Sequence, residues 1–112
     1  MLATFAQALL FNHSIADWDV SSVSDMSFMF YQAPSFDQDI SPWNISNVES
    51  LQGLFYEAVS FNQDILVWDT SNVKNMQTVF YGAESFDQDI SSWDVSKADI
   101  MVETFYEALS FN

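Results

Sequence analysis

Aspartate is the residue type in this chain best placed to do chemistry. Asp39, Asp64 and Asp89 follow one another at intervals of 25 residues. Oxygen ligands suit Ca²⁺, and identical carboxylates set side by side repel unless a cation lies between them. These three residues are therefore the candidate metal ligands, with calcium as the ion. The alternative is that each aspartate accepts a hydrogen bond from a loop N–H group and otherwise only keeps the chain soluble.

Catalysis has no comparable candidate. The chain lacks cysteine, and its single histidine, His13, occupies a position that is glutamine in the other copies of the repeat described below. Paired carboxylates such as Asp37 with Asp39 are of the kind that glycosidases use. They recur from copy to copy, as scaffold residues do. We therefore expect no catalytic residue, no cofactor other than calcium, and no enzymatic activity.

The charge of the chain excludes two classes of partner. Sixteen acidic residues stand against two lysines and no arginine, which gives a formal net charge of −14. A nucleic-acid binder needs cations to neutralise phosphates, and an anionic membrane surface repels a chain of this charge. No apolar run reaches the roughly 20 residues of a membrane-spanning helix. We expect neither nucleic-acid binding nor membrane insertion by this segment.

The elements that would position these side chains come from a 25-residue repeat. Phe, Trp and Tyr recur in fixed columns, and every Trp and every Tyr of the chain lies in one of them. The complete copies are 11–35, 36–60, 61–85 and 86–110, after a partial copy at 1–10 and before the start of another at 111–112. We predict one domain over residues 1–112, excerpted from a longer array of repeats.

Each repeat has two halves with different hydrophobic periods. In the first half, Ile40, Trp43 and Ile45 carry the spacing of a short strand, with Trp in the core. In the second half, apolar residues are spaced three and four apart, which predicts a helix from about the twelfth to the twenty-third position. A serine begins this half in every copy and predicts a helix cap; these serines are Ser21, Ser46, Ser71 and Ser96. The predicted fold is an α/β solenoid with one short parallel strand and one helix per repeat.

The repeat resembles that of a known family. The run Ile-x-x-Trp-x-Val-Ser-x-Val is similar to the leucine-rich-repeat signature, and "FDQDISSWDVS" and "FNQDILVWDTSNVKNM" resemble the repeats of BspA-like leucine-rich-repeat surface proteins. The resemblance covers the whole chain. It implies a leucine-rich-repeat-like solenoid, a location on the cell surface or outside the cell, and a role in adhesion or protein binding.

The candidate partner-binding face lies on the predicted strands. Leu66 and Val67 form an apolar pair where other copies are small or polar, and acidic residues flank them. An apolar centre with a charged rim is typical of a protein-binding patch. The residues assigned to this face are Asp17, Asp19, Leu66, Val67, Asp69 and Asp94. They predict a basic or neutral protein partner from a host or matrix.

A structural role is the alternative function. Stacked repeats without capping units expose an edge and an apolar rung at each end, which favours end-to-end assembly into fibres. A calcium-linked matrix component belongs to the same alternative. The partner would then be a second copy of the chain.

Overall fold

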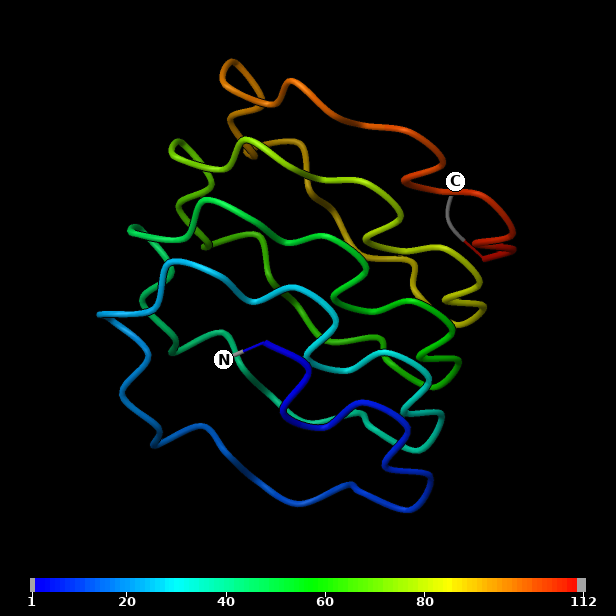
Figure 1. Cartoon of the computed structure of the whole chain (residues 1–112). Helices are drawn as coiled ribbons and strands as arrows, with labels where there is room; N and C mark the ends of the chain where they lie inside the picture. Colours follow the sequence, from blue (N-terminus) through cyan, green and yellow to red (C-terminus); the bar gives the residue numbers. More distant parts are fainter. Residues whose placement is uncertain (1, 111–112) are drawn as a thin grey trace.

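The chain folds as a stack of coils, one for each 25-residue repeat (Figure 1). The computed structural model describes residues 2–110. The first coil (blue) lies at one end of the stack and the last coil (orange to red) at the other. The radius of gyration is 12.5 Å and the extents are 33 × 30 × 21 Å. These dimensions are those of a compact globule of about this length.

The predicted α/β leucine-rich-repeat solenoid is wrong. Residues 2–110 contain no helix, and therefore none that could cross a membrane. The strand content within the same range is limited to isolated parallel bridges, which join Asp25 to Ser50, Ser50 to Asn75, and Asn75 to Ile100. All four bridging residues lie in the half of the repeat that was predicted to be helical. The predicted strand at 40–45 is irregular and contains a turn.

Backbone hydrogen bonds explain why the second half of each repeat is not a helix. Met26, Phe28 and Phe30 donate their N–H groups to carbonyls of the next coil, at 2.8–3.0 Å. The intervening Met29 and Tyr31 donate to the carbonyl three residues back, at 3.3 and 3.1 Å. Every second N–H group is thus committed to a neighbouring coil. A helix would need all of them for bonds within the segment.

Left-handed backbone conformations break up the same segment. Phe28 has φ 58° and Gln32 has φ 51°, each at the third position of a turn. A positive φ at that position is the mark of a type II turn and is incompatible with a right-handed helix. It recurs throughout two columns of the repeat: Ala3, Phe28, Gly53, Thr78 and Glu103, and Gln7, Gln32, Glu57, Gly82 and Glu107.

The close spacing of the coils is a further reason why this segment does not form a helix. The ring centroids of Phe30 and Phe55 lie 5.8 Å apart, as do those of Phe55 and Phe80. Neighbouring helices need an interaxial distance of about 8–10 Å. Coils packed this closely have no room for helices side by side. The apolar residues spaced three and four apart lie in consecutive turns of one coil instead.

Aromatic columns form the centre of the core. Within one coil, Phe30 stacks on Phe36 with centroids 3.9 Å apart, and both rings are fully buried. The prediction of tryptophan in the core is confirmed for Trp43, which is 3% exposed and donates its indole N–H to the carbonyl oxygen of Ile15 at 3.0 Å. Trp18, in the first complete coil, is 41% exposed. Among the tryptophans, the buried ones are Trp43 and Trp68 of the two inner coils.

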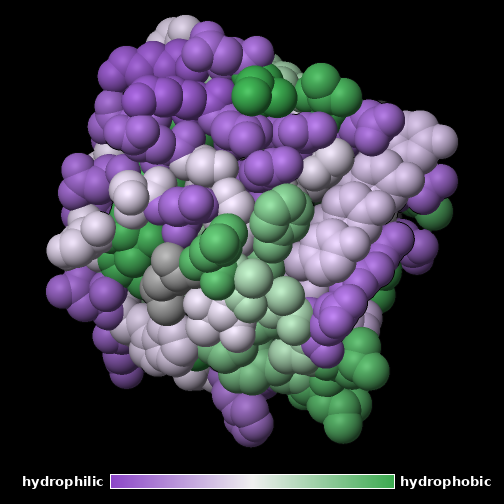
Figure 2. Space-filling view, in the orientation of Figure 1, coloured by the Kyte–Doolittle hydropathy of each residue, from purple (hydrophilic) through white to green (hydrophobic). Residues whose placement is uncertain are grey.

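Apolar side chains also reach the surface in the first and last coils. Figure 2 shows hydrophilic side chains over most of the upper coils and hydrophobic ones gathered lower down, where the first coils lie. Leu9 and Leu10 are 63% and 89% exposed. In the last coil, Val102 and Leu109 are 56% and 76% exposed.

The serines predicted as helix caps close turns instead. Ser46 donates both its N–H and its hydroxyl to Oδ1 of Asn44, at 3.1 and 2.7 Å. With no helix after it, the hydroxyl has no free N–H group of a first turn to cap. Glu49, three residues after Ser46, forms an ion pair with Lys74 of the next coil at 2.9 Å.

Of Gly53 and Gly82, Gly53 is the glycine where an added side chain would meet the closer contact. Its φ is +58°, and a Cβ atom there would lie 2.6 Å from the ring of Phe28 in the preceding coil. We expect Gly53→Ala to lower the free energy of unfolding by about 2–3 kcal/mol, from left-handed strain and the ring clash together. Urea unfolding measures the loss.

Gly82→Ala is the matched control for this prediction. Gly82 has φ +64°, and the added Cβ would meet the flexible Cγ of Glu57 at 3.0 Å. The backbone strain is the same, but the neighbour can move, so a loss of about 1 kcal/mol is expected. Equal losses for the two variants would show that the Phe28 ring does not limit the approach of the coils.

Candidate functional site

The three predicted metal ligands lie in equivalent turns of successive coils. In each, the carboxylate accepts a hydrogen bond from the N–H group two residues ahead: Asp39 from Ser41 at 2.9 Å, Asp64 from Leu66 at 2.9 Å, and Asp89 from Ser91 at 2.8 Å. Among residues 2–110, no three or more acidic or histidine side chains converge to hold a metal ion. The turns match the alternative left open by the sequence, and calcium binding by these aspartates stays a prediction.

A second column of aspartates repeats this turn. Asp19 accepts hydrogen bonds from the N–H and hydroxyl groups of Ser21, at 3.0 and 2.6 Å. Asp69 and Asp94 accept the N–H groups of Ser71 and Ser96 at 3.0 and 2.9 Å. The carboxylates are exposed, yet the chain holds each in one orientation.

Hydrogen bonds from serine lower the pKa of five of these carboxylates. The hydroxyl of the serine two residues ahead, and then its N–H group, hold the pKa below the ordinary aspartate value at Asp19, Asp39, Asp69, Asp89 and Asp94. At Asp69 the neighbouring charge of Asp94 raises the pKa, and the charge of Lys97 lowers it. The two aspartates and this lysine therefore share one electrostatic neighbourhood.

The apolar pair is divided between surface and interior. Val67 is 73% exposed, as predicted, whereas Leu66 is half-buried. The hydroxyl of Ser92, in the next coil, donates to the carbonyl oxygen of Leu66 at 2.7 Å and holds the two turns together. Val67 is thus the apolar side chain that a partner could contact on this surface, and Leu66 is partly covered beside it.

The other assigned residues divide along the stack. Asp69 and Asp94 occupy adjacent coils, while Asp17 and Asp19 are exposed on the coil 11–35, two coils from Asp69. None lies on a strand. We call the exposed turns that carry Asp19, Asp39, Asp64, Val67, Asp69, Asp89 and Asp94 the acidic face.

Sequence reasoning missed the lysine of this neighbourhood. Lys97 donates from Nζ to Oδ1 of Asn72 at 2.8 Å, one coil away. It stands in a column where the two preceding copies have Asn47 and Asn72, whose amides donate to backbone carbonyls of the coil before. The break in the column is visible in the sequence. Its position beside Asp69 and Asp94 requires the fold.

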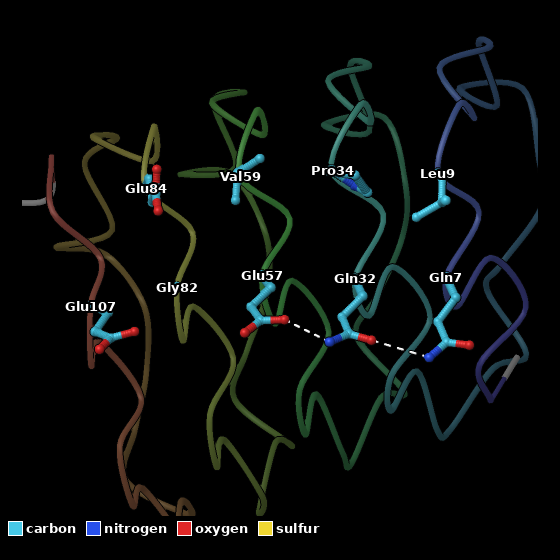
Figure 3. A pocket seen from close by; sticks show the side chains of 9 residues that line it. All are labelled: Gln7, Leu9, Gln32, Pro34, Glu57, Val59, Gly82, Glu84 and Glu107. Atoms are coloured by element: carbon cyan, nitrogen blue, oxygen red, sulfur yellow. Dashed lines mark hydrogen bonds between the residues drawn. The ribbon is translucent and has the colours of Figure 1, made fainter.

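A groove on another part of the surface was also missed. It has a volume of about 720 Å³ and crosses the coils between two rows of side chains (Figure 3). The first row holds Gln7, Gln32, Glu57, Gly82 and Glu107, and the second holds Leu9, Pro34, Val59 and Glu84. The rows are columns 22 and 24 of the repeat. Their composition is readable from the sequence, but the hollow between them depends on the turns that replace the expected helix.

Hydrogen bonds order one end of the groove and leave the other open. Gln7 donates to Gln32 at 3.1 Å, and Gln32 donates to Glu57 at 2.7 Å. Gly82 then interrupts the first row, because it has no side chain to continue the series (Figure 3). Glu84 lies across the groove in the same coil as Gly82, and Glu107 lies in the next coil (Figure 3). The groove therefore passes from amide and apolar side chains to carboxylates.

The aspartate turns predict how stability depends on pH. Because the pKa of Asp69 is lower in the folded chain than its ordinary value, its turn stabilises the fold above the ordinary aspartate pKa, and this contribution is lost as the pH falls through and below that value. Asp69→Asn keeps the acceptor, as Asn44 does naturally. We expect the Tm of the native chain to fall relative to that of Asp69→Asn between about pH 5 and pH 2.

Thermal unfolding followed by circular dichroism across that range measures the difference. Ala cannot accept the hydrogen bond, so Asp69→Ala should melt below Asp69→Asn at every pH. A constant difference in Tm between the native chain and Asp69→Asn would show that the turn does not lower the carboxyl pKa.

Comparison with known proteins gives one match. A family model described as "Mycoplasma protein of unknown function, DUF285" matches residues 1–112. No curated protein and no solved structure matches the chain. The description states no ligand, partner or activity that could be compared with the acidic face or the groove. Because the match extends over the whole sequence, the chain belongs to the DUF285 family.

Proposed function

We propose that this chain is a non-enzymatic binding module that presents its acidic face to a basic region of a protein partner. The observation that supports this function best is the regular set of carboxylates, each oriented by a hydrogen bond to a turn N–H group, around the exposed Val67. The resemblance to BspA-like surface proteins supports a place for the module on the cell surface or outside the cell, in adhesion or protein binding.

Preorganisation makes such a surface effective. A side chain that is already fixed loses little conformational entropy on binding. The net charge of −14 attracts a basic partner from a distance and raises the rate of association. Val67, 73% exposed, supplies apolar area that a partner can remove from water.

The alternative function is structural assembly of copies end to end or through calcium. Sedimentation velocity over a concentration series, with and without millimolar calcium, separates the two functions. A binding module should remain monomeric in both conditions. Growth of the sedimenting species with concentration or calcium would favour the structural function instead.

Charge on the acidic face should control binding of a basic probe. The probe is a labelled synthetic peptide with central leucines flanked by lysines, and fluorescence anisotropy measures its Kd. Asp69→Asn with Asp94→Asn should weaken binding about five- to tenfold, because two exposed ion pairs are lost. Val67→Ser should weaken it about two- to threefold through lost apolar contact.

The control removes the same charge from another part of the surface. Asp25 and Asp99 are exposed, and Asn is compatible with the turn at Asp25, because Asn75 accepts the equivalent hydrogen bond two coils on. Asp25→Asn with Asp99→Asn should change Kd less than twofold. Equal weakening by both pairs would mean that the probe senses only net charge, and the acidic face would lose its assignment.

A further inference from the structure

We propose that the groove between columns 22 and 24 is a second binding site, one that takes an extended peptide segment with apolar residues at one end and lysine or arginine at the other. It lies in different columns from the acidic face, and the inference does not depend on the function proposed above. Its residues come from successive coils, so only the stacked structure assembles it (Figure 3).

The dimensions of the groove suit a short extended chain. Its volume of about 720 Å³ lies within the range of about 300–1,000 Å³ that ligand clefts occupy. Gln7 and Glu107 are separated by four coil spacings of about 4.8 Å each, or roughly 19 Å. An extended peptide rises about 3.3 Å per residue. About six residues would therefore span the groove across the coils.

One end of the groove is apolar and neutral. Leu9 is 63% exposed, and Pro34 and Val59 are half-buried behind it in the next two coils. Opposite them, the amides of Gln7 and Gln32 bond to one another and onward to Glu57. Leu, Val or Ile side chains of a peptide would remove this apolar row from water.

The other end carries negative charge without a cation of its own. Glu57, Glu84 and Glu107 line it. The two lysines of the chain are engaged elsewhere, Lys74 with Glu49 at 2.9 Å and Lys97 with Asn72 at 2.8 Å, and neither lines the groove. The complementary group is therefore a cation supplied by the ligand.

The gap at Gly82 shows where that cation would lie. Every other member of the first row is a glutamine or a glutamate, and Gly82 alone adds no side chain to the row between Glu57 and Glu107. The Cγ atom of Glu57 lies 3.0 Å from the place that a Cβ atom of residue 82 would take, so the Glu57 side chain borders this gap. A guanidinium or ammonium group entering there would have carboxylates on both sides along the row and Glu84 across the groove. The amide and apolar half then sets which end of the peptide carries the cation.

Filling the gap tests the site directly. Gln7 and Gln32 occupy the same column with φ 59° and 51°, so Gly82→Gln completes the row with a side chain that the column carries elsewhere, at the backbone strain already expected for Gly82→Ala. The probe is a labelled six-residue peptide with three leucines followed by three arginines, measured by fluorescence anisotropy. Gly82→Gln should weaken binding at least tenfold, and Glu84→Gln with Glu107→Gln should do the same. Circular dichroism checks that each variant folds.

Three controls define the outcomes that would overturn the proposal. Asp25→Asn with Asp99→Asn removes as much charge outside the groove, and an equal loss from it would mean nonspecific attraction. A greater loss from Asp69→Asn with Asp94→Asn than from the groove variants would place the peptide on the acidic face. A linear tetraamine that binds as tightly as the peptide, with the same dependence on Gly82→Gln, would show a site for small oligocations instead.

Discussion

The donation of backbone N–H groups from one coil to the carbonyls of the next is the interaction on which the rest of this structure depends. Met26 to Ser50, Leu51 to Asn75 and Met76 to Ile100 repeat the same bond at 3.0, 2.9 and 2.8 Å. These bonds hold successive coils in register. Equivalent side chains then lie directly above one another, and the ring of Phe55 stacks between those of Phe30 and Phe80.

This register also dictates the unusual backbone of each coil. Alternate N–H groups donate to carbonyls of the neighbouring coil. The N–H groups between them therefore form their hydrogen bonds within the same coil, in turns. Within residues 2–110, the turns place eight non-glycine residues at positive φ. Each residue in such a conformation costs free energy when considered alone. The conformations persist here because buried aromatic columns and bonds to the adjacent coils constrain each coil in the same way.

The two proposed binding sites lie where the columns depart from repetition. A perfectly regular stack would present uniform rows of polar side chains. Val67 adds an apolar side chain to the acidic face, Lys97 adds a cation beside Asp69, and Gly82 interrupts a row of longer side chains. Each departure changes the surface at one coil and leaves the interior columns intact. The scaffold can thus be conserved in form while its surface varies.

Much of this protein could be read from the sequence. The 25-residue period, the exposure of Val67 and the burial of Trp43 follow from spacing and residue type, because a period brings identical residues together whatever the backbone does. The same holds for the alternative turn role of Asp39, since an aspartate ahead of a serine readily accepts a nearby N–H group.

The backbone itself was decided by tertiary structure. Apolar residues at spacings of three and four fit both a helix and a series of turns, and the local sequence around Phe30 does not distinguish them. The choice between helix and turns depends on backbone hydrogen bonds that join residues 24 apart in neighbouring coils. It also depends on a ring spacing of 5.8 Å, which leaves no room for helices. The groove beside Gly82 exists for the same reason: its walls come from residues that only the stacking of coils places side by side.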